Sequence, residues 1–230
     1  MVGQKIGGAV DPCGAATATY MMVYTGDYSG DTDKACFTNG TASKDSTNGG
    51  TPTFSADYVE FTAANVYASW AISGKDGFDS AIGTLCFTVT IVDGDANTDV
   101  DANYLIEIRY DPNNYLTIGS IDVADKIQVG WKSNSLTTIG LTSATSLTLG
   151  NAFRVCASWD AANDHIAYSM VAKGSATSWQ ETTSTNVDVW AAEPTDIKVG
   201  EYYAGATNVD INRVADLYIF STYQATDPNQ

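Results

Sequence analysis

Large apolar residues recur at every second position in several stretches of the chain. Leu85, Phe87, Val89 and Ile91 share one face of the stretch Thr84–Val92, and positions 153, 155, 157 and 159 are apolar in the same way. A period of two is the signature of a β-strand with one face on a core and the other partly wet. The pattern therefore predicts half-buried strands.

The same reading extends along the whole chain, and helix signals are nearly absent. Turn sequences such as Asp111-Pro112-Asn113-Asn114 and Asp160–Asp164 separate neighbouring stretches and predict hairpins. The predicted strands are Thr19–Tyr24, Asp57–Thr62, Thr84–Val92, Tyr104–Tyr110, Tyr115–Ile118, Lys126–Trp131, Phe153–Trp159, His165–Val171, Asp196–Val199 and Ala215–Phe220.

This many strands in one chain predict an all-β fold, a two-sheet antiparallel jelly-roll β-sandwich. Thr38–Thr53 is rich in Gly, Thr, Ser and Asn and is expected to be a long surface loop. It is not a domain boundary, because the apolar residues before it need the core that follows. Residues 1–230 are expected to form a single domain, in which 1–53 supply an N-terminal strand and this polar loop.

The chain is strongly acidic, with a net charge of −16 and 27 Asp and Glu against 11 Lys and Arg. Nucleic-acid binding is not expected, because affinity for phosphate rests on basic contacts. Anionic membranes are disfavoured for the same reason, and no apolar run approaches the ~20 residues of a membrane span. The acidity fits either solubility alone or one or more cation sites.

Four cysteines, Cys13, Cys36, Cys86 and Cys156, contain no C-x-x-C pair, which argues against a zinc or redox site. Cys86 and Cys156 stand at matching places in two strands, opposite the large apolar residues. The natural pairing is Cys86–Cys156 and Cys13–Cys36, which implies an oxidising setting. The alternative is four buried free thiols in a cytosolic protein.

The second cysteine lies in a recognisable motif. Arg154-Val155-Cys156-Ala157-Ser158-Trp159-Asp160-Ala161 resembles the pentraxin signature His-x-Cys-x-Ser/Thr-Trp-x-Ser/Thr, with Arg154 in place of the His and Ala161 in place of the last residue. Cys86 stands where pentraxins place the disulfide partner. The segments Ile197–Gly200 and Val214–Phe220 are similar to the ending of laminin-G-like domains.

This resemblance covers about residues 54–222 and implies a concanavalin-A-like jelly roll with an inter-strand disulfide. It also implies non-catalytic recognition of glycans, phospho-ligands or proteins, often through calcium and often in oligomers. In the stretch that matches the pentraxin calcium site, Glu201 is the single acidic residue, so that site is not carried over.

A different segment is the best candidate for a metal. Asp93, Asp95, Asn97, Asp99 and Asp101 place oxygens at alternate positions, as at the start of a calcium loop. The alternative is a solvated acidic loop, since Thr98 and Tyr104 stand where an EF-hand has Gly and Glu. The acidic run Asp27–Asp33 is a second, weaker candidate.

Catalysis has little support in the sequence. Glycosidases need two carboxylates facing one cleft. Glu107 is the strand glutamate in a comparable setting, and Arg109 on the same face is expected to pair with it. The single histidine, His165, follows a turn, and a hydrogen-bonding role fits it better than that of a catalytic base.

Aromatic residues that could stack on sugars are a further candidate set, although core packing is the alternative for each. Trp159 is expected in the core, because it continues an apolar alternation. Tyr202 and Tyr203, beyond a predicted strand end, are the preferred ligand contacts. The remaining candidates are Trp70, Trp131, Trp179 and Trp190.

The leading functional hypothesis is a non-enzymatic structural and recognition protein on a particle surface, a phage or virus virion component such as a capsid decoration, tail or fibre subunit. It rests on Met1–Val10 lacking an apolar signal segment, on ends expected to be held in an assembly, and on an acidic Thr-, Gly- and Asn-rich composition. Its expected partners are other structural subunits, including copies of itself. The alternative is a secreted or cell-surface lectin-like carbohydrate-binding module, with calcium as a candidate cofactor.

Overall fold

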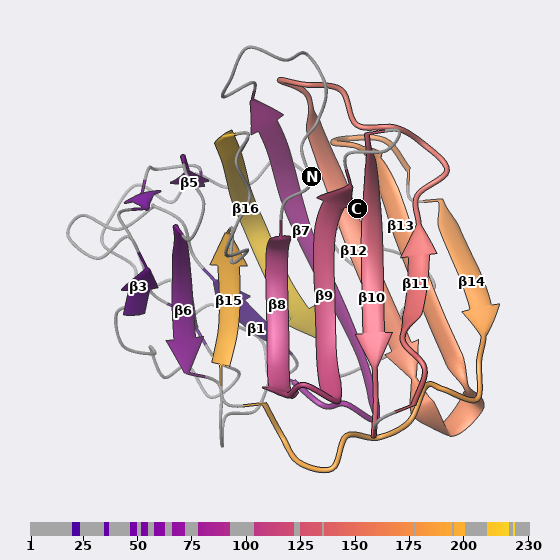
Figure 1. Ribbon diagram of the computed structural model, residues 1–230. Helices are drawn as coiled ribbons and strands as arrows, with labels where there is room; N and C mark the ends of the chain where they lie inside the picture. Colours follow the sequence, from indigo (N-terminus) through magenta and orange to yellow (C-terminus); the bar gives the residue numbers. More distant parts are fainter. Residues whose placement is uncertain are drawn as a thin grey trace.

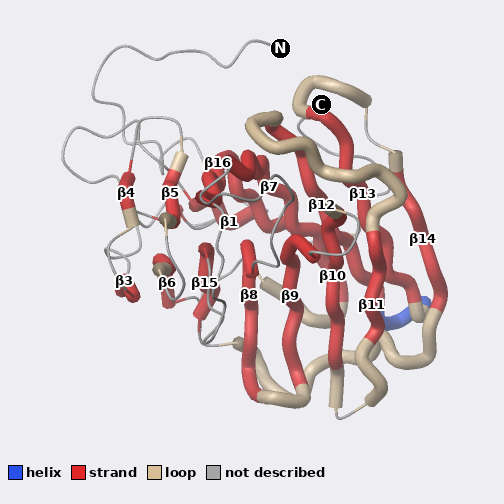
Figure 2. The backbone as a smooth tube through the Cα atoms, turned by 45° about the horizontal axis from the view of Figure 1, so that its top comes forward, coloured by secondary structure: helices blue, strands red, loops and turns tan. Residues whose placement is uncertain are grey.

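The computed structural model describes residues 20–23, 35–36, 47–49, 52–54, 58–62, 66–71, 78–92, 104–121, 125–134, 136–176, 178–194, 196–200, 211–220 and 223. Side chains are described for these residues except 20–23, 35–36, 47–49, 54, 70, 71 and 196. Within them the chain forms two antiparallel sheets that pack face to face (Figure 1). In the described residues, helix is confined to one 3-10 turn, Ala161–Asn163 (Figure 2).

The back sheet, behind in Figure 1, has nine strands. β16 lies beside β7 along its whole length, and its other edge pairs with β1 in one half and with β5 in the other. The order is β14 (Trp179–Thr183), β13 (His165–Ala172), β12 (Ala152–Asp160), β7 (Ile82–Val92), β16 (Ile211–Phe220), β1 (Tyr20–Val23) and β2 (Ala35–Cys36), with β5 (Val59–Phe61) also on β16 and β4 (Thr53–Phe54) on β5.

The front sheet, which faces the viewer in Figure 1, has seven strands. Three of them follow one another in the chain as hairpins, β8, β9 and β10, so their register is local. The order is β11 (Ile139–Thr142), β10 (Lys126–Lys132), β9 (Asn114–Ile121), β8 (Tyr104–Asp111), β15 (Asp196–Gly200), β6 (Tyr67–Ala71) and β3 (Thr47–Gly49).

The core lies between the sheets and is built from the alternating apolar residues. Leu85, Phe87, Val89 and Ile91 of β7 face Ile106, Ile108, Leu116 and Ile118 of the front sheet, and all are buried. Burying such side chains stabilises the fold by about 1.5–3 kcal/mol each. At one end Phe78, Trp131, Trp159 and Trp190 pack with ring centroids 5.0–5.6 Å apart.

Trp159 explains one glycine. A Cβ on Gly83, its cross-strand partner, would lie 2.4 Å from the indole ring, so no larger residue fits there without a shift. The indole N–H donates to the Asp79 carbonyl at 2.7 Å. Trp159 is therefore a core residue, as its alternation predicted.

The predicted disulfide is present. Cys86 of β7 and Cys156 of β12 are directly opposed, with Cα atoms 4.1 Å apart, and the bridge lies on the outer face of the back sheet. Cys13 lies outside the described residues and the Cys36 side chain is not described, so the second bridge stays a prediction.

The predicted fold class and all ten predicted strands are confirmed. Two expectations were wrong in detail. Thr38–Thr53 is not loop throughout, since β3 and the start of β4 lie within it. Such short strands form because neighbouring backbone groups can pair even where the side chains are polar. The strands β7 and β12 were expected to expose one face to solvent. Their outward residues Thr84, Cys86 and Ser158 are instead as buried as the inward ones.

Candidate functional site

The outer face of the front sheet carries the most unusual chemistry in the described part of the chain. Alternation within β8, β9 and β10 sends apolar residues to the core and leaves Arg109, Tyr115 and Lys132 on the outside. The register places these three in one row across neighbouring strands, with Tyr115 in the middle. We call this set the front row.

The front row combines one aromatic ring with two cations, and all three side chains are half-exposed. The Arg109 guanidinium carbon lies 5.6 Å from the Tyr115 ring centroid, within the range of a cation–π contact. The Tyr115 hydroxyl is 3.2 Å from Thr138 Oγ1. The ring is therefore held in place and still accessible.

Glu107 lies one row further along the same face and is 7% exposed. Its carboxylate is 3.6 Å from the Arg109 guanidinium and 3.6 Å from the Lys198 ammonium. These separations are ion pairs, not short hydrogen bonds, and Oε1 of Glu107 has no hydrogen-bond partner. The charge of this buried carboxylate is therefore compensated by two cations on the same face.

The balance of charge on this face differs from that of the whole chain. Arg109, Lys126, Lys132 and Lys198 point outward, against the carboxylates of Glu107 and Asp196 at outward register positions. Asp111 at the end of β8 adds a third carboxylate, so the strands of this sheet carry four cations against three carboxylates, a balance of +1, whereas the chain carries −16. Within the described chain, neither Lys126 nor Lys132 forms an ion pair.

Beside the charged residues, two glycines of the sheet lie next to the polar side chains of Thr117 and Gln128. Gly130 and Gly140 occupy paired outward positions of β10 and β11. A Cβ on Gly130 would lie 2.7 Å from Thr117 Oγ1, so the Thr117 hydroxyl rests over this glycine. Glycine at such strand positions lets another group approach the backbone closely. The result is a flat polar surface next to the front row.

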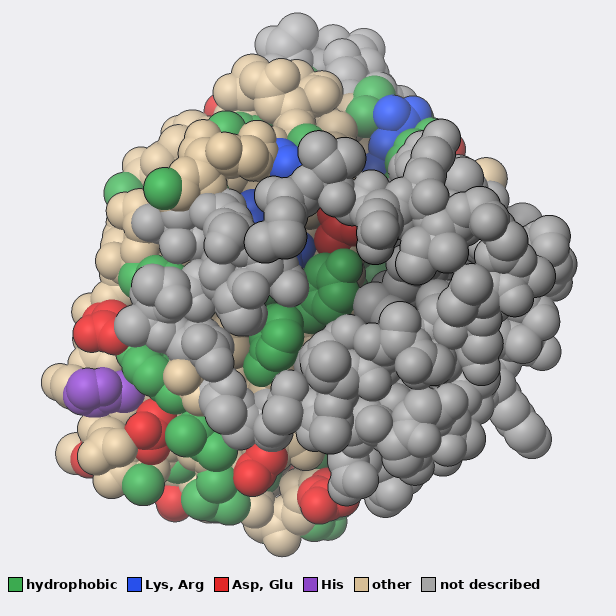
Figure 3. Space-filling model, turned by 180° about the vertical axis from the view of Figure 1, so that it is seen from behind, with side chains coloured by type: hydrophobic (Ala, Val, Ile, Leu, Met, Phe, Trp, Pro, Cys, Tyr) green, Lys and Arg blue, Asp and Glu red, His purple; other side chains and the backbone are tan. Residues whose placement is uncertain are grey.

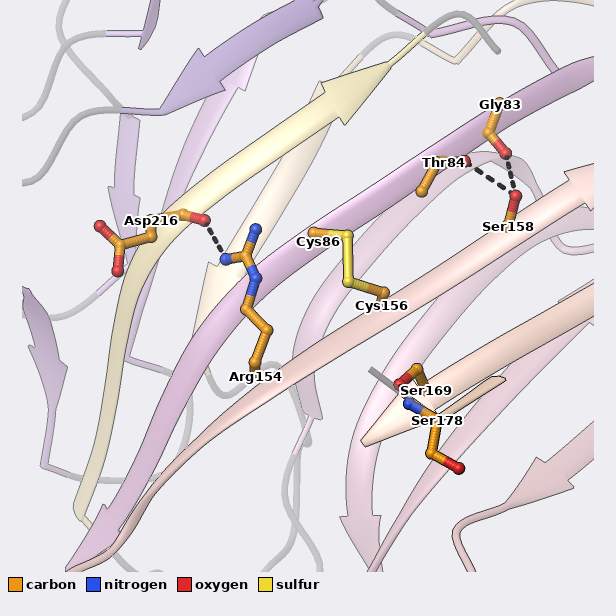
Figure 4. Close-up of a disulfide and its surroundings, with 9 residues drawn as sticks. All are labelled: Gly83, Thr84, Cys86, Arg154, Cys156, Ser158, Ser169, Ser178 and Asp216. Atoms are coloured by element: carbon orange, nitrogen blue, oxygen red, sulfur yellow. Dashed lines mark hydrogen bonds between the residues drawn. A yellow bond between two sulfur atoms is a disulfide. The ribbon is translucent and has the colours of Figure 1, made fainter. Parts of the chain in front are cut away.

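The outer face of the back sheet has a different character (Figure 4). The disulfide lies between Arg154 and the pair Thr84–Ser158, whose hydroxyls are 2.8 Å apart. Arg154, 7% exposed, donates to the Asp216 carbonyl at 2.9 Å and lies 5.5 Å from the Tyr218 ring centroid. Figure 3 shows acidic side chains and the single histidine toward one end of this face. Thr84, Ser158 and Arg154 therefore have side-chain or backbone partners within this face.

One small pocket of about 230 Å³ lies between β13, β14 and the segment after β11. The Tyr168 hydroxyl lies against the Thr142 carbonyl and the side-chain oxygen of Gln180, and burial raises the pKa of Tyr168. The pocket is lined without a charged side chain and is smaller than the ~300–1,000 Å³ of most small-molecule sites. It is a weaker candidate than the front row.

Several predicted site residues lie outside the described residues, so these predictions stay untested. They are the ligand contacts Tyr202 and Tyr203, the acidic run Asp27–Asp33, and the calcium loop of Asp93, Asp95, Asn97, Asp99 and Asp101. Among the residues the structure does describe, no three His, Cys, Asp or Glu side chains come together as a metal site.

For two of the tryptophans, the prediction that they could stack on sugars is wrong. Trp131 is fully buried and Trp190 is 4% exposed, because both belong to the aromatic cluster between the sheets. Trp179 is half-buried on the edge strand β14, and its indole nitrogen has no hydrogen-bond partner. Trp70 lies on β6, and its side chain is not described.

The two residues considered for catalysis contact other side chains. Glu107 pairs with Arg109, as predicted, and its second neighbour Lys198 is also a cation. His165 begins β13 at the end of a hairpin, with its ring centroid 6.3 Å from that of Tyr223.

Sequence reasoning missed Tyr115 and Lys132. A signal for both was available, because they occupy the outward positions of strands that follow one another as hairpins. Aligning β8, β9 and β10 as consecutive hairpins would have placed both residues in one row with Arg109.

No protein-family model matches the chain, and no curated protein sequence matches it as a relative. Structural comparison does find matches. The binding domain of botulinum neurotoxin serotype D superposes with a TM-score of 0.67 at 11% identity, covering 92% of this chain and 50% of that one. The binding domain of botulinum neurotoxin DC in complex with SialylT gives 0.64 at 10% identity, covering 94% and 49%.

A third match is botulinum neurotoxin type C, whose cell entry is described as dependent upon interaction with two ganglioside molecules. It has a TM-score of 0.62 at 10% identity, covering 88% of this chain and 48% of that one. The chain thus spans about half the length of these proteins. At such identities the likeness shows the fold alone, a jelly-roll β-sandwich. It does not extend to the pentraxin family in particular.

Proposed function

We propose that this protein is a non-catalytic, lectin-like module that binds glycans on the outer face of its front sheet. The observation that carries the proposal is the front row, a fixed and half-exposed tyrosine ring between two cations. The fold is compatible with this role, since two of the similar structures are described with gangliosides or a sialyl ligand.

The chemistry of the face suits a sugar. The apolar face of a pyranose ring can pack on an aromatic ring such as Tyr115, while its hydroxyl groups need donors and acceptors around that ring. Arg109 and Lys132 supply donors on either side of the ring. A flat surface suits an oligosaccharide chain better than a compact small molecule.

The absence of catalysis is part of the proposal. A glycosidase needs a second carboxyl group about 5–10 Å from the first. The two groups that contact the Glu107 carboxylate are cations instead. We expect no sugar release by the native protein and no change in that result for Glu107→Gln.

The disulfide supports a setting outside the reducing cytosol, either extracellular or on a particle surface. Among the described residues there is no helix of the length and hydrophobicity needed to cross a membrane. We further propose that residues 1–230 form one domain, since a single core joins both sheets.

The decisive test removes the ring. Tyr115→Ala is expected to weaken glycan binding roughly thirtyfold, equivalent to about 2 kcal/mol for a central aromatic contact. Tyr223→Ala, at a half-exposed tyrosine that contacts the back sheet, is the matched control and should bind normally. A glycan array followed by calorimetry gives the readout. The proposal fails if the native protein binds no glycan or if Tyr115→Ala binds as tightly as the native protein.

The virion role, the homo-oligomer and the calcium loop rest on the sequence and are separate proposals. Co-sedimentation of the native protein with large particles would support the first, and its mass in solution tests the second. Glycan binding with and without a chelator tests the third, because loss of binding would implicate Asp93–Asp101.

A further inference from the structure

The distribution of cations on the front sheet indicates which class of glycan the protein binds. This inference rests on the proposed function. We infer that the ligand of the front face is an acidic glycan, one that carries carboxylate or sulfate groups. The first observation is the charge balance of the front-sheet strands, which is +1 in a chain whose net charge is −16.

The second observation is how the cations are paired. On the back sheet every described cation has a partner: Arg154 bonds the Asp216 carbonyl, Lys173 lies 3.2 Å from the Asp216 carboxylate, and Arg213 lies 2.7 Å from Glu60. On the front sheet Arg109 and Lys198 share one carboxylate, and Lys126 and Lys132 have no described ion-pair partner. Positive charge is therefore left over on this face.

The geometry suits an anionic substituent on a sugar ring. Arg109 and Lys132 are on strands either side of Tyr115, so their backbones are about 10 Å apart at two strand spacings. A ring stacked on Tyr115 would present its exocyclic groups to either cation. The planar guanidinium of Arg109 matches a carboxylate, and the ammonium of Lys132 acts as a point charge for carboxylate or sulfate.

Glu107 does not counteract this preference. Its carboxylate is buried, with both neighbouring cations 3.6 Å away, so an anion at the surface meets Arg109 and Lys198 first. Long polyanions such as nucleic acid are a worse fit, because they extend beyond the face and meet the acidic remainder of the chain. A short acidic oligosaccharide brings negative charge to the cations of the front face and does not extend onto the acidic remainder of the chain.

The experiment uses matched probes and matched lysines. Sialylated oligosaccharides and sulfated galactose oligosaccharides are each compared with the same chain lacking the acidic group, by calorimetry on the native protein. Lys132→Gln removes a cation from the front row, and Lys173→Gln removes an equal charge from the back sheet, where the lysine is exposed.

We expect the acidic member of a pair to bind at least tenfold more tightly than its neutral counterpart. Lys132→Gln should weaken binding of the acidic probe roughly five- to tenfold, the effect of losing one charge-assisted contact. It should weaken binding of the neutral probe less, because Gln keeps a neutral N–H donor. Lys173→Gln should change neither. The preference should also shrink as salt is raised from 50 to 500 mM, since salt screens exposed charges.

The outcomes separate the two proposals. Equal affinity for acidic and neutral probes, with both lost in Tyr115→Ala, overturns the acidic-glycan inference and keeps the lectin-like function. Preference for acidic probes that is equally reduced by Lys132→Gln and Lys173→Gln overturns the assignment to the front row. Binding of single-stranded DNA in preference to every acidic glycan overturns the inference in favour of a polyanion site, and no binding to any glycan overturns both proposals.

Discussion

The outer faces of the two sheets differ in how their charged groups are used. On the back sheet the centre is buried, a disulfide bridges the two central strands, and Arg154 is held by the Asp216 carbonyl and the Tyr218 ring. On the front sheet the side chains of the front row are half-exposed, and Lys132 has no described ion-pair partner. Charge on the back therefore serves packing, whereas charge on the front is available to a ligand.

This comparison predicts a division of effects. Changes on the back sheet should lower the free energy of unfolding and leave binding by the folded protein intact. Changes in the front row should weaken binding and leave the free energy of unfolding nearly unchanged, because half-exposed side chains contribute little to stability.

The largest expected effect is loss of the disulfide. The double variant Cys86→Ala, Cys156→Ala opens a loop with a sequence separation of 70 residues. In the chain-entropy model this lowers the free energy of unfolding by about 4 kcal/mol. Urea unfolding followed by tryptophan fluorescence measures the loss, and the folded variant should keep its glycan affinity. A shift under 1 kcal/mol would contradict a stabilising role for the bridge.

A smaller effect is expected at Arg154. Arg154→Met keeps the apolar stem but leaves the Asp216 carbonyl without its charged donor, at a cost of about 2 kcal/mol in unfolding free energy. Lys173→Met is the control, since this lysine also pairs with Asp216 but is exposed, and it should cost less than about 1 kcal/mol. Equal losses in the two variants would mean that burial does not distinguish them.

The smallest effect is a pH dependence at the β8–β9 hairpin. Hydrogen bonds from the Asn114 side chain and the Asn113 N–H hold the pKa of Asp111 below its ordinary value of 3.8. A lowered pKa gives stability that is present above pH 3.8 and lost as pH falls through the folded-state value. Asp111→Ala should therefore unfold at lower urea than the native protein at pH 6.

The difference in urea midpoint between the native protein and Asp111→Ala should shrink below the ordinary pKa of Asp111, because the native carboxylate then takes up a proton. Urea midpoints at pH 6 and pH 3 measure it, and glycan binding at pH 6 should be unaffected. A difference that grows toward low pH would show that the sign is wrong.

Much of the back sheet could be predicted from the sequence. The alternation in Thr84–Val92 and Phe153–Trp159, with cysteines at matching positions, was enough to predict two strands, their bridge and a core position for Trp159. The short strands β2, β3, β4, β6, β11 and β14 were missed, because their pairing depends on neighbours distant in the chain or on backbone groups.

Trp131 and Trp190 show what the sequence could not predict. Their sequence neighbours did not reveal that both rings meet Phe78 and Trp159 between the sheets, since these contacts join four distant segments.

The sequence by itself determined the strands, the sheet-forming alternation and the fold class, because a period of two fixes which side chains share a face of one strand. The tertiary structure decided which faces of different strands meet. It buried the outward side of β7, moved two tryptophans into the core, and brought Arg109, Tyr115, Lys132 and Lys198 onto one surface. Such groupings depend on strand order, which contacts between distant segments decide and local pattern does not.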